Sequence, residues 1–402
     1  MTPFINRVVI ENYKSITDCN VNLASLVFLV GPNGSGKSNF LDALQFVARS
    51  VHISVEQALN ERSGINGVLS RFSHHERRFG IRLDFTLEHQ RAGHYAFQIE
   101  AGPGGGFSVA REECVLSGDE NRQPMYYRVQ DDKLDTNVTL LAGKQIDRHN
   151  LFLKTLSTGY VMGSEFDPLR RSLAAMKFYN INPSSFRNPA TTSGVESTDS
   201  LERDGANTTS LIRALANENE TAMQRIEVYL QKLAPNVGGV RAGFVGNQQI
   251  LEFPVQDDPT QIFYASSMSD GTLRALAILV ALFQALPPSR ISIPLIAIEE
   301  PEAALHPAAT GVLFDSLREM SQHTQILVTS HSPDLLDNKD IEADSILAVE
   351  SNQDGSHLAV LNNASRSMIR DHLYTAGELL RSNQAYPSPL PSTQKVNLFD
   401  NI

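Results

Sequence analysis

The feature that most constrains this chain is a glycine-rich segment of the form G-x-x-x-x-G-K-S at 31–38. Two runs typical of strands, 5–11 and Leu26 to Val30, come before it with a polar turn region between them, and an amphipathic run typical of a helix, 41–51, follows. A strand, a glycine loop and a helix in this order predict a phosphate-binding loop. Backbone N–H groups and the helix N-terminus then point at one anion.

The residues of this loop and its neighbour are candidate nucleotide ligands: Gly31, Pro32, Asn33, Gly34, Ser35, Gly36, Lys37, Ser38 and Asn39. Lys37 is expected to reach the β- and γ-phosphates and to act in catalysis, and the Ser38 hydroxyl is expected to bind Mg²⁺. ATP and Mg²⁺ are therefore the expected ligands. The alternative is a glycine turn that only connects a strand to a helix.

Polar residues also end two later apolar runs that have the length of buried strands. Glu299 and Glu300 follow the run 294–298, and His331 comes shortly after the run 325–329. Ligands bind at the carboxyl ends of parallel strands. Glu299 is therefore the candidate Mg²⁺ partner, Glu300 the candidate general base for the attacking water, and His331 the candidate sensor of the γ-phosphate. The alternatives are a solvated strand end for the glutamates and a histidine that caps a turn.

A second helix start has the features of an anion site. Ser269 is a good N-cap for the apolar helical run 273–286, and Gly271 lets another backbone come close. One nucleotide needs only one phosphate loop, so this helix end suits the nucleotide bound by a second copy of the chain; helix capping alone is the alternative. Lys14 is a candidate for contact with the adenine, with a surface lysine as the alternative.

Charge and cysteine content restrict the partners. The 402 residues include 34 Lys and Arg against 45 Asp and Glu, a formal net charge of −11, which excludes wholesale binding of polyanions. DNA would need a local basic patch. The densest basic stretch consists of Arg71, His74, His75, Arg77, Arg78 and Arg82. A solvated charged face is the alternative. The two cysteines are far apart, which disfavours a disulfide scaffold and a zinc site.

Hydropathy gives no sign of a membrane segment. The longest apolar run, 275–283, is far shorter than the roughly 20 residues of a membrane span. The N-terminus, MTPFINRVVI, lacks the layout of a signal peptide. We therefore expect a cytoplasmic protein with no membrane partner.

Periodicity divides the chain into four segments. The first, 1–120, holds the phosphate loop and then a period-two alternation that predicts a flanking antiparallel β subdomain. An inserted helical and loop region is expected at 121–260, with a mobile loop at 190–209. Short apolar strands alternate with helices at 261–381, which predicts an α/β fold with a mainly parallel core sheet. The Pro- and Ser-rich tail, 382–402, is expected to be disordered.

Four motifs stand in one order along the chain: GPNGSGKSN, MSDGT, IAIEEPEAALHP and VTSHS. This set resembles the ABC-type ATPases of the RecF/SMC group, which are P-loop NTPases. More narrowly, it resembles the stand-alone AAA family ATPases related to RecF and to the head of the OLD proteins. The opening IENYKSI is similar to the first strand and turn of the family. The resemblance is strong at 1–50 and 260–350.

The resemblance implies a role for each motif, in chain order: the Walker A loop (31–38), the signature motif (Ser269 and Gly271), the Walker B pair (Glu299 and Glu300), the D-loop (304–306) and the switch histidine (His331). The signature motif would act on the ATP of a partner subunit, giving a homodimer, or a higher homo-oligomer, with nucleotides sandwiched between copies. Two motifs depart from the usual pattern. Glu299 stands where transporters have Asp, and the signature reads SDGT instead of SGGQ.

Two functions are compatible with these motifs. The first is an ATPase that dimerises around ATP and acts in DNA repair or maintenance, or in defence against phages. The second is a regulatory or scaffold subunit that controls a separately encoded effector, such as a nuclease, without acting on DNA. No acidic cluster after His331 resembles the Toprim nuclease of OLD proteins, and no heptads predict a long SMC-like arm. A transporter motor fits these motif variants poorly.

Overall fold

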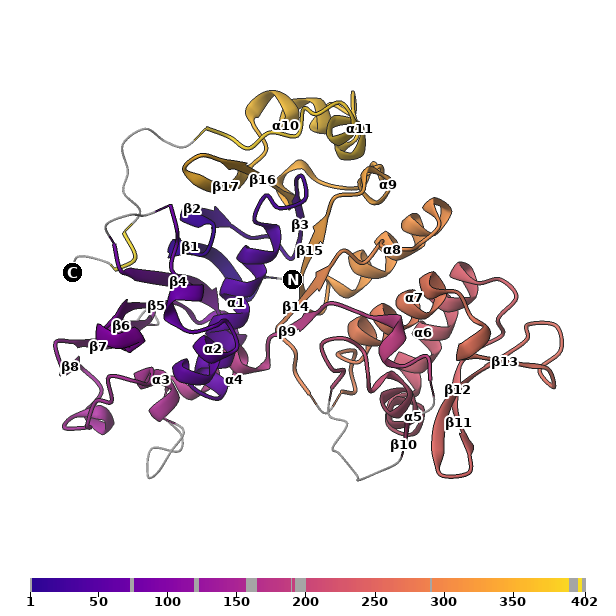
Figure 1. The fold of residues 1–402 in the computed structure, drawn as a ribbon, viewed down its shortest axis with the longest axis horizontal. Coiled ribbons are helices and arrows are strands. Elements are labelled where there is room, and N and C mark those ends of the chain that lie inside the picture. Colours follow the sequence, from indigo (N-terminus) through magenta and orange to yellow (C-terminus); the bar gives the residue numbers. More distant parts are fainter. Residues whose placement is uncertain are drawn as a thin grey trace. The chain divides into compact units, whose positions relative to one another are not determined.

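The computed structural model describes residues 2–72, 76–118, 123–156, 165–188, 190–191, 200–289, 291–389 and 397–399. They belong to two compact units (Figure 1). Unit 1 comprises Lys177–Glu342 and Asp371–Ser382, and unit 2 comprises Thr2–Met176, Ala343–Arg370 and Asn383–Ile402.

Unit 2 is built on a sheet with the strand order β8-β7-β6-β5-β4-β1-β2-β17-β16-β3. Its strands are β1 (Ile5–Tyr13), β2 (Ile16–Asn22), β3 (Leu26–Val30), β4 (Arg78–Thr86), β5 (Ala92–Ala101), β6 (Phe107–Leu116), β7 (Met125–Gln130), β8 (Lys133–Thr136), β16 (Ile346–Asn352) and β17 (Gly355–Val360). The strands from β8 to β2 pair antiparallel, whereas β17 pairs parallel with β2 and β16 pairs parallel with β3. The antiparallel sheet predicted from the period-two alternation therefore continues into the parallel strands.

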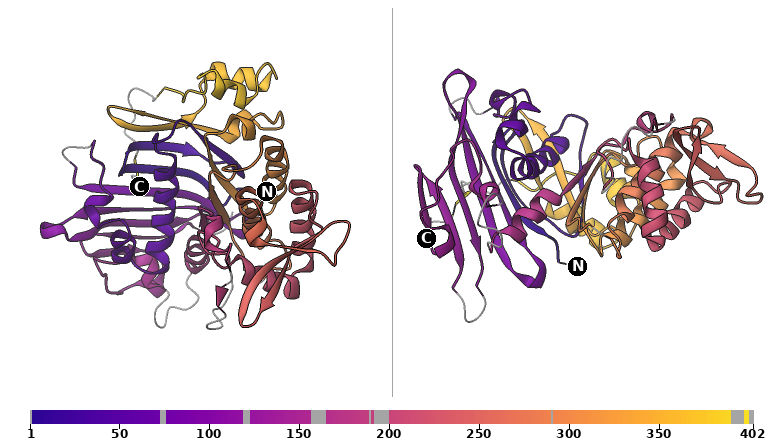
Figure 2. Two further views of the ribbon diagram at one scale, coloured as in Figure 1. Left: turned by 45° about the vertical axis from the view of Figure 1, so that its right-hand side comes forward. Right: turned by 90° about the horizontal axis from the view of Figure 1, so that it is seen from below.

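Helices of unit 2 cover one face of this sheet. They are α1 (Lys37–His52), α2 (Val55–Asn60), α3 (Phe152–Thr155) and α4 (Asp167–Ala175). Helix α10 (Asn363–Arg370), near the C-terminus, instead contacts the 3₁₀ turn Ala343–Ser345. Figure 2 shows α1 lying along the sheet, and α1 also contacts α2, α3 and α4. The apolar face predicted for this helix is buried, including Leu41, Leu44, Phe46 and Val47. Burial of this face fixes the helix that follows the glycine loop.

The region between the first two predicted strands is itself a strand, β2, so the expected polar turn region was wrong. Ile16, Cys19 and Val21 are buried, whereas Asn20 and Asn22 are exposed. The sequence ITDCNVN is mostly polar and gives a weak alternation. Antiparallel pairing with β1 supplies the burial that local propensity does not.

Unit 1 contains the parallel strand order β15-β14-β9 and a small antiparallel sheet. The parallel strands are β9 (Lys177–Tyr179), β14 (Leu295–Glu299) and β15 (Gln325–Ser330), and the small sheet has β10 (Ala190–Thr191), β11 (Arg241–Val245), β12 (Gln248–Pro254) and β13 (Ile262–Tyr264). The helices are α5 (Thr208–Glu218), α6 (Glu220–Leu233), α7 (Asp270–Phe283), α8 (Thr310–Met320), α9 (Pro333–Leu336) and α11 (Ala376–Arg381). The alternation of strands and helices predicted for this part of the chain is confirmed.

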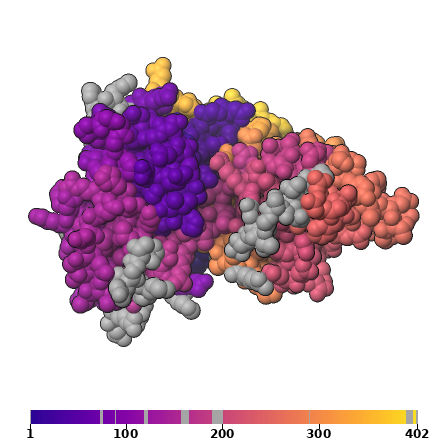
Figure 3. All heavy atoms as spheres, turned by 60° about the horizontal axis from the view of Figure 1, so that its bottom comes forward, coloured from indigo at the N-terminus to yellow at the C-terminus, as the bar shows by residue number. Residues whose placement is uncertain are grey.

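Helix α7 forms the core of unit 1. Nearly all of its residues from Leu273 to Phe283 are buried, and it packs against α5, α6 and α8. Strands β11, β12 and β13 project from these helices (Figures 1 and 3). No helix in the described part of the chain has the length and apolar character needed to span a membrane.

The expected inserted region at 121–260 does not form a body of its own. Its residues up to Met176 belong to unit 2, where β7 and β8 extend the sheet, and its remaining residues belong to unit 1. Of the predicted loop at 190–209, residues 192–199 lie outside the described residues. Helix α5 begins within that loop, at Thr208.

The C-terminal tail is ordered in part, which differs from the expectation of disorder. Pro387 bridges to Leu361, and the Ser388 N–H donates to the Val360 carbonyl at 2.8 Å. Leu398 is buried on unit 2, and its carbonyl accepts a hydrogen bond from Arg82. Residues 390–396 and 400–402 of this tail lie outside the described residues.

Candidate functional site

The glycine loop of unit 2 lies between β3 and α1, as the sequence predicts. Gly36 precedes α1 with φ 113°, and a Cβ there would lie 2.3 Å from the Ser356 Oγ on β17. A glycine is needed for both its conformation and its lack of a side chain. Because this N-cap residue carries no side chain, nothing from it covers the first N–H groups of α1, which can then bind an anion.

Three side chains of the loop fit a polyphosphate. The Lys37 Nζ donates to the carbonyl oxygens of Gly31 at 2.7 Å and Pro32 at 2.9 Å, so the ammonium lies over the loop. The Ser35 Oγ is buried and has no hydrogen-bond partner among the described residues. The Ser38 side chain is exposed at the start of α1. An ammonium, a hydroxyl lacking a partner and an exposed hydroxyl are the groups that phosphate oxygens and Mg²⁺ require.

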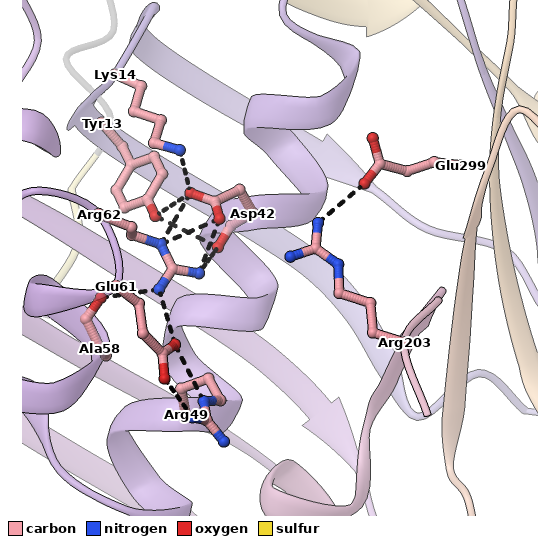
Figure 4. Close-up of polar contacts among 9 residues, drawn as sticks. All are labelled: Tyr13, Lys14, Asp42, Arg49, Ala58, Glu61, Arg62, Arg203 and Glu299. Carbon is pink, nitrogen blue, oxygen red and sulfur yellow. Dashed lines mark hydrogen bonds and ion pairs between the residues drawn. The ribbon is translucent and has the colours of Figure 1, made fainter. Parts of the chain in front are cut away.

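The Asp42 carboxylate on α1, the helix that follows this loop, contacts two cationic side chains, Lys14 and Arg62 (Figure 4). Its carboxylate lies 2.6 Å from the Lys14 Nζ, accepts hydrogen bonds of 3.0 Å from the Arg62 Nε, and accepts one of 2.7 Å from the Tyr13 hydroxyl. Burial would raise the pKa of the Asp42 carboxyl, but hydrogen bonds from Arg62, the charge of Arg62 and the contact with Lys14 hold it below its ordinary value. Lys14 therefore has a carboxylate partner, and its contact with adenine stays a prediction.

In unit 1, the strand end β14 presents the predicted general base. Glu300 has φ 44°, and its N–H donates to the Thr329 carbonyl at 3.0 Å, while its own carbonyl accepts from the Arg274 Nη1 at 3.2 Å. These hydrogen bonds hold a backbone conformation that is unfavourable for glutamate. The Glu300 Oε1 lies 3.2 Å from the His331 Nδ1. The structure thus brings the predicted base and the predicted sensor together.

Glu299, the predicted Mg²⁺ partner, has an unforeseen neighbour (Figure 4). The Arg203 Nη2 lies 3.4 Å from the Glu299 Oε1. The two residues are 96 positions apart, so no sequence spacing could have revealed the pair. Within the described residues, no group of three or more His, Cys, Asp or Glu side chains gathers as a metal site. Mg²⁺ at Glu299 would therefore need oxygen atoms from nucleotide and water, a set of ligands that this ion accepts.

A buried carboxyl supports the turn that carries His331. The Ser330 hydroxyl donates to the Glu302 Oε1 at 2.5 Å and accepts from the Ser332 N–H at 3.1 Å. Burial raises the pKa of the Glu302 carboxyl, against the effect of the hydrogen bond from Ser330. Glu302 and Ser330 thus link the segment after β14 to the C-terminal end of β15.

The predicted signature residues lie at the start of α7. Ser269 is exposed, and its Oγ accepts a hydrogen bond from the Thr272 N–H at 3.1 Å, so it is the N-cap that the sequence predicts. Gly271 is buried, and a Cβ there would lie 2.3 Å from the Ala304 carbonyl oxygen. The close backbone approach predicted for Gly271 is confirmed, and the neighbouring backbone is that of Ala304 and Leu305.

The basic stretch at 71–82 does not form one exposed surface. Arg82 is 6% exposed and pairs with Asp84 at 2.7 Å, so its place in a DNA-binding patch was wrong. Arg71, Arg77 and Arg78 are exposed, and His74 and His75 lie outside the described residues. Among the described residues of this stretch, Arg71, Arg77 and Arg78 remain candidates for a basic patch.

Two family models match the chain. Residues 4–142, which include the glycine loop, match a model described as an AAA ATPase domain. Residues 183–337, which include Ser269, Glu300 and His331, match a model described as an AAA domain, putative AbiEii toxin, Type IV TA system. No curated protein sequence matches the chain.

Solved structures of SMC head domains are similar to the chain. One is an SMC head bound to the C-winged helix domain of ScpA, with 16% identity, a TM-score of 0.53, and coverage of 91% of this chain and 99% of that chain. Another is an SMC head with an extended coiled coil, bound to the C-terminal domain of ScpA and derived from Pyrococcus furiosus. It has 15% identity, a TM-score of 0.54, and coverage of 92% of this chain and 100% of that chain. At these identities the likeness shows the fold.

Proposed function

We propose that this chain, two segments of which match AAA-type ATPase domains and whose fold is similar to that of SMC heads, binds ATP at the glycine loop, dimerises around the nucleotide and hydrolyses it. The observation that carries the proposal is the loop itself. Lys37 lies over a glycine loop whose close packing on Val349 and Ser356 excludes a Cβ at Gly31 and Gly36, beside a buried Ser35 hydroxyl that lacks a partner among the described residues. Such a loop suits phosphate oxygens.

In this proposal the Lys37 ammonium exchanges its bonds to the Gly31 and Pro32 carbonyls for bonds to phosphate oxygens. A charge-assisted bond to phosphate is stronger than a bond to a carbonyl, so the exchange favours the nucleotide. Ser38 and Glu299 would hold Mg²⁺, which neutralises charge on the phosphates.

Glu300 then accepts a proton from the attacking water. Its carboxylate is 40% exposed at the strand end, which leaves room for water beside it. The His331 Nδ1 faces Glu300, so the Nε2 is the ring nitrogen available to the γ-phosphate. This arrangement supports a base and a phosphate contact that lie 3.2 Å apart, between the Glu300 Oε1 and the His331 Nδ1.

Ser269 supports the dimer. It is exposed at the N-terminus of α7, where the helix dipole favours an anion, although no phosphate loop of this chain precedes it. The ATP bound by a second copy is the anion we assign to it. We place this homodimer, or a higher homo-oligomer, in the cytoplasm, in DNA repair or maintenance or in defence against phages. The AbiEii description of the model that matches 183–337 supports the defence setting.

A second candidate function is a regulatory or scaffold subunit that controls a separately encoded effector such as a nuclease. Burial of Arg82 favours it, because fewer cations remain in the basic stretch to bind DNA. The matched SMC heads are themselves bound to domains of another protein, ScpA.

Replacing Glu300 tests the first function. The variant Glu300→Gln keeps the side-chain shape but removes the base, so ATP should still bind while hydrolysis falls by about 10²–10⁴-fold. Isothermal titration and phosphate release measure the two properties. Glu342→Gln, an exposed glutamate of the same unit, is the matched control and should retain full turnover. Undiminished hydrolysis by Glu300→Gln, or lack of ATP binding by the parent protein, would overturn the proposal.

Duplex DNA separates the two candidate functions. Stimulation of hydrolysis by DNA that disappears in a double variant, Arg77→Ala with Arg78→Ala, favours direct action on DNA. Both arginines are exposed, so the fold should tolerate their removal. Lack of stimulation, together with an effector that co-purifies, favours the regulatory subunit.

A further inference from the structure

The loop before α7 is held by one arginine from a distant part of unit 1. The Arg187 Nη1 donates to the carbonyl oxygens of Met268 at 2.8 Å and Ala265 at 3.2 Å. The Arg187 Nη2 donates to the Asp270 carboxylate. A single guanidinium therefore binds the residues immediately before and after Ser269.

The backbone that presents Arg187 is itself fixed. The Arg187 N–H donates to the Pro183 carbonyl at 3.1 Å, and the preceding Phe186 is buried. The Ser185 hydroxyl donates to the Asp204 carboxylate at 2.6 Å. The 3₁₀ turn Pro183–Ser185 also packs against α7. Arg187 thus extends from a rigid support toward the start of that helix.

The geometry of the peptide bond between Met268 and Ser269 determines where the Ser269 N–H points. In a trans peptide, the carbonyl of one residue and the N–H of the next point in opposite directions. Because the Met268 carbonyl points at Arg187, the Ser269 N–H points away from Arg187. The contact with Asp270 fixes the backbone on the other side of Ser269. The Ser269 hydroxyl is held in turn by the N–H of Thr272 at 3.1 Å and the hydroxyl of Thr272 at 2.8 Å. Arg187 therefore orients the backbone of Ser269, and the start of α7 orients its hydroxyl.

Charge gives Arg187 a second effect. The Asp270 side chain is 66% exposed, and its carboxylate would repel a polyphosphate that approaches Ser269. The Arg187 guanidinium pairs with this carboxylate and offsets its charge. A lysine could supply the charge, but it lacks the planar set of five donors that reaches two carbonyls and a carboxylate together.

We propose that Arg187 is a positioning residue for the signature motif: it orients Ser269 toward the ATP held by a second copy and neutralises Asp270 beside it. This inference rests on the proposed ATP-dependent dimer. It assigns Arg187 no contact with ATP bound by its own phosphate loop. Loss of Arg187 should therefore weaken dimerisation and leave ATP binding by the monomer unchanged.

The test uses the Glu300→Gln protein as parent, since it retains ATP. Arg187→Ala should lower the association constant for ATP-dependent dimerisation at least about tenfold, which is the effect of losing a charge-assisted contact. The Kd of the monomer for ATP should stay within about twofold of the parent value. Arg187→Lys should be intermediate. Sedimentation velocity and ATP titration at low protein concentration measure the two constants. Arg225→Ala is the matched control, because Arg225 pairs with Glu319 elsewhere in unit 1.

The outcomes separate this inference from the function on which it rests. A parent that stays monomeric with ATP overturns both. A parent that dimerises, with Arg187→Ala dimerising equally well, overturns only the role of Arg187. That role is also overturned if Arg187→Ala and Arg225→Ala lose dimerisation alike, since such a result marks general destabilisation.

Discussion

The Lys37 side chain of the phosphate loop lies buried against two carbonyls of its own loop, whereas Glu300 and His331 at the strand ends of unit 1 are 40% and 44% exposed. Both regions follow buried strands and carry polar groups. In the loop, close contacts with neighbouring backbone and β17 determine the shape of the cradle. In unit 1, hydrogen bonds fix the backbone and leave the reactive side chains open. The comparison separates a loop whose shape is fixed by packing, the proposed ligand cradle, from exposed side chains that are proposed to act on the ligand.

Removing Lys37 should have the largest effect of the variants proposed here, and the property affected is ATP binding at the glycine loop. Lys37→Ala should weaken ATP binding at least about 100-fold, because charge-assisted bonds to two phosphates are lost. Isothermal titration measures the loss, and the melting temperature shows whether the loop still folds. Ser38→Ala, at an exposed position, should bind ATP but lose most of its dependence on Mg²⁺. ATP binding by Lys37→Ala at the parent affinity would show that the loop is only a structural turn.

Gly271→Ala should disrupt the start of α7 in unit 1 and leave the glycine loop of unit 2 intact. The added Cβ would meet the Ala304 carbonyl oxygen at 2.3 Å, so the start of α7 must shift. We expect ATP-dependent dimerisation to fall about tenfold or more and ATP binding by the monomer to be retained. Gly311→Ala on α8 is the matched control, since its Cβ would meet nothing within 4 Å. Equal dimerisation by the two variants would contradict a role for the start of α7.

Asp42→Asn tests which contacts stabilise α1, the helix that follows the glycine loop. The variant should lower the free energy of unfolding by about 2 kcal/mol at pH 7, because hydrogen bonds from Arg62 and Lys14 to a carboxylate are lost. The folded-state pKa of Asp42 lies below its ordinary value, so this stabilisation is present above about pH 4 and disappears as the pH falls through the folded-state pKa.

Urea unfolding between pH 3 and 7 checks this prediction about Asp42. The difference between the parent and Asp42→Asn should shrink on acidification. Asp132→Asn, which removes an exposed ion pair with Arg148, is the control. A difference that stays constant with pH would mean that the Asp42 carboxylate does not stabilise α1.

Arg203→Ala should have the smallest effect on stability and on ligand binding. It changes the exposed strand end in unit 1, where Arg203 pairs with Glu299. Arg203 is 57% exposed and 3.4 Å from Glu299, so its removal should change the free energy of unfolding by less than about 1 kcal/mol. Glu299 then loses a competing cation, and the Mg²⁺ concentration needed for half-maximal ATP binding should fall a few-fold. Arg241→Ala, from an equally exposed pair with Glu252, is the control. A higher Mg²⁺ requirement would contradict this competition.

Local sequence patterns predicted the elements whose burial is periodic. The glycine loop, α1 and strands β4, β5 and β6 occur where the sequence places them, because turn chemistry and apolar spacing decide these elements locally. Strand β2 escaped prediction because its burial depends on pairing with β1. The ordered tail segment that includes Leu398 escaped for the same reason, since its contacts come from β4.

The sequence could not predict the ion pairs that shape the candidate site. Arg187 and Asp270 are 83 positions apart, and Arg203 and Glu299 are 96 positions apart. Nothing in local propensity selects one arginine among the many in the chain. Motif order identified Glu300 and His331, but the tertiary fold alone shows the 3.2 Å contact between them.

Sedimentation of the Glu300→Gln protein tests the central claim most directly. Its molecular mass in solution should be that of a monomer with Mg²⁺-ADP and twice that with Mg²⁺-ATP, and Ser269→Arg in the same background should remain monomeric with either nucleotide. A protein that binds ATP yet keeps one mass under all conditions would contradict the proposal that two copies of this chain share each nucleotide.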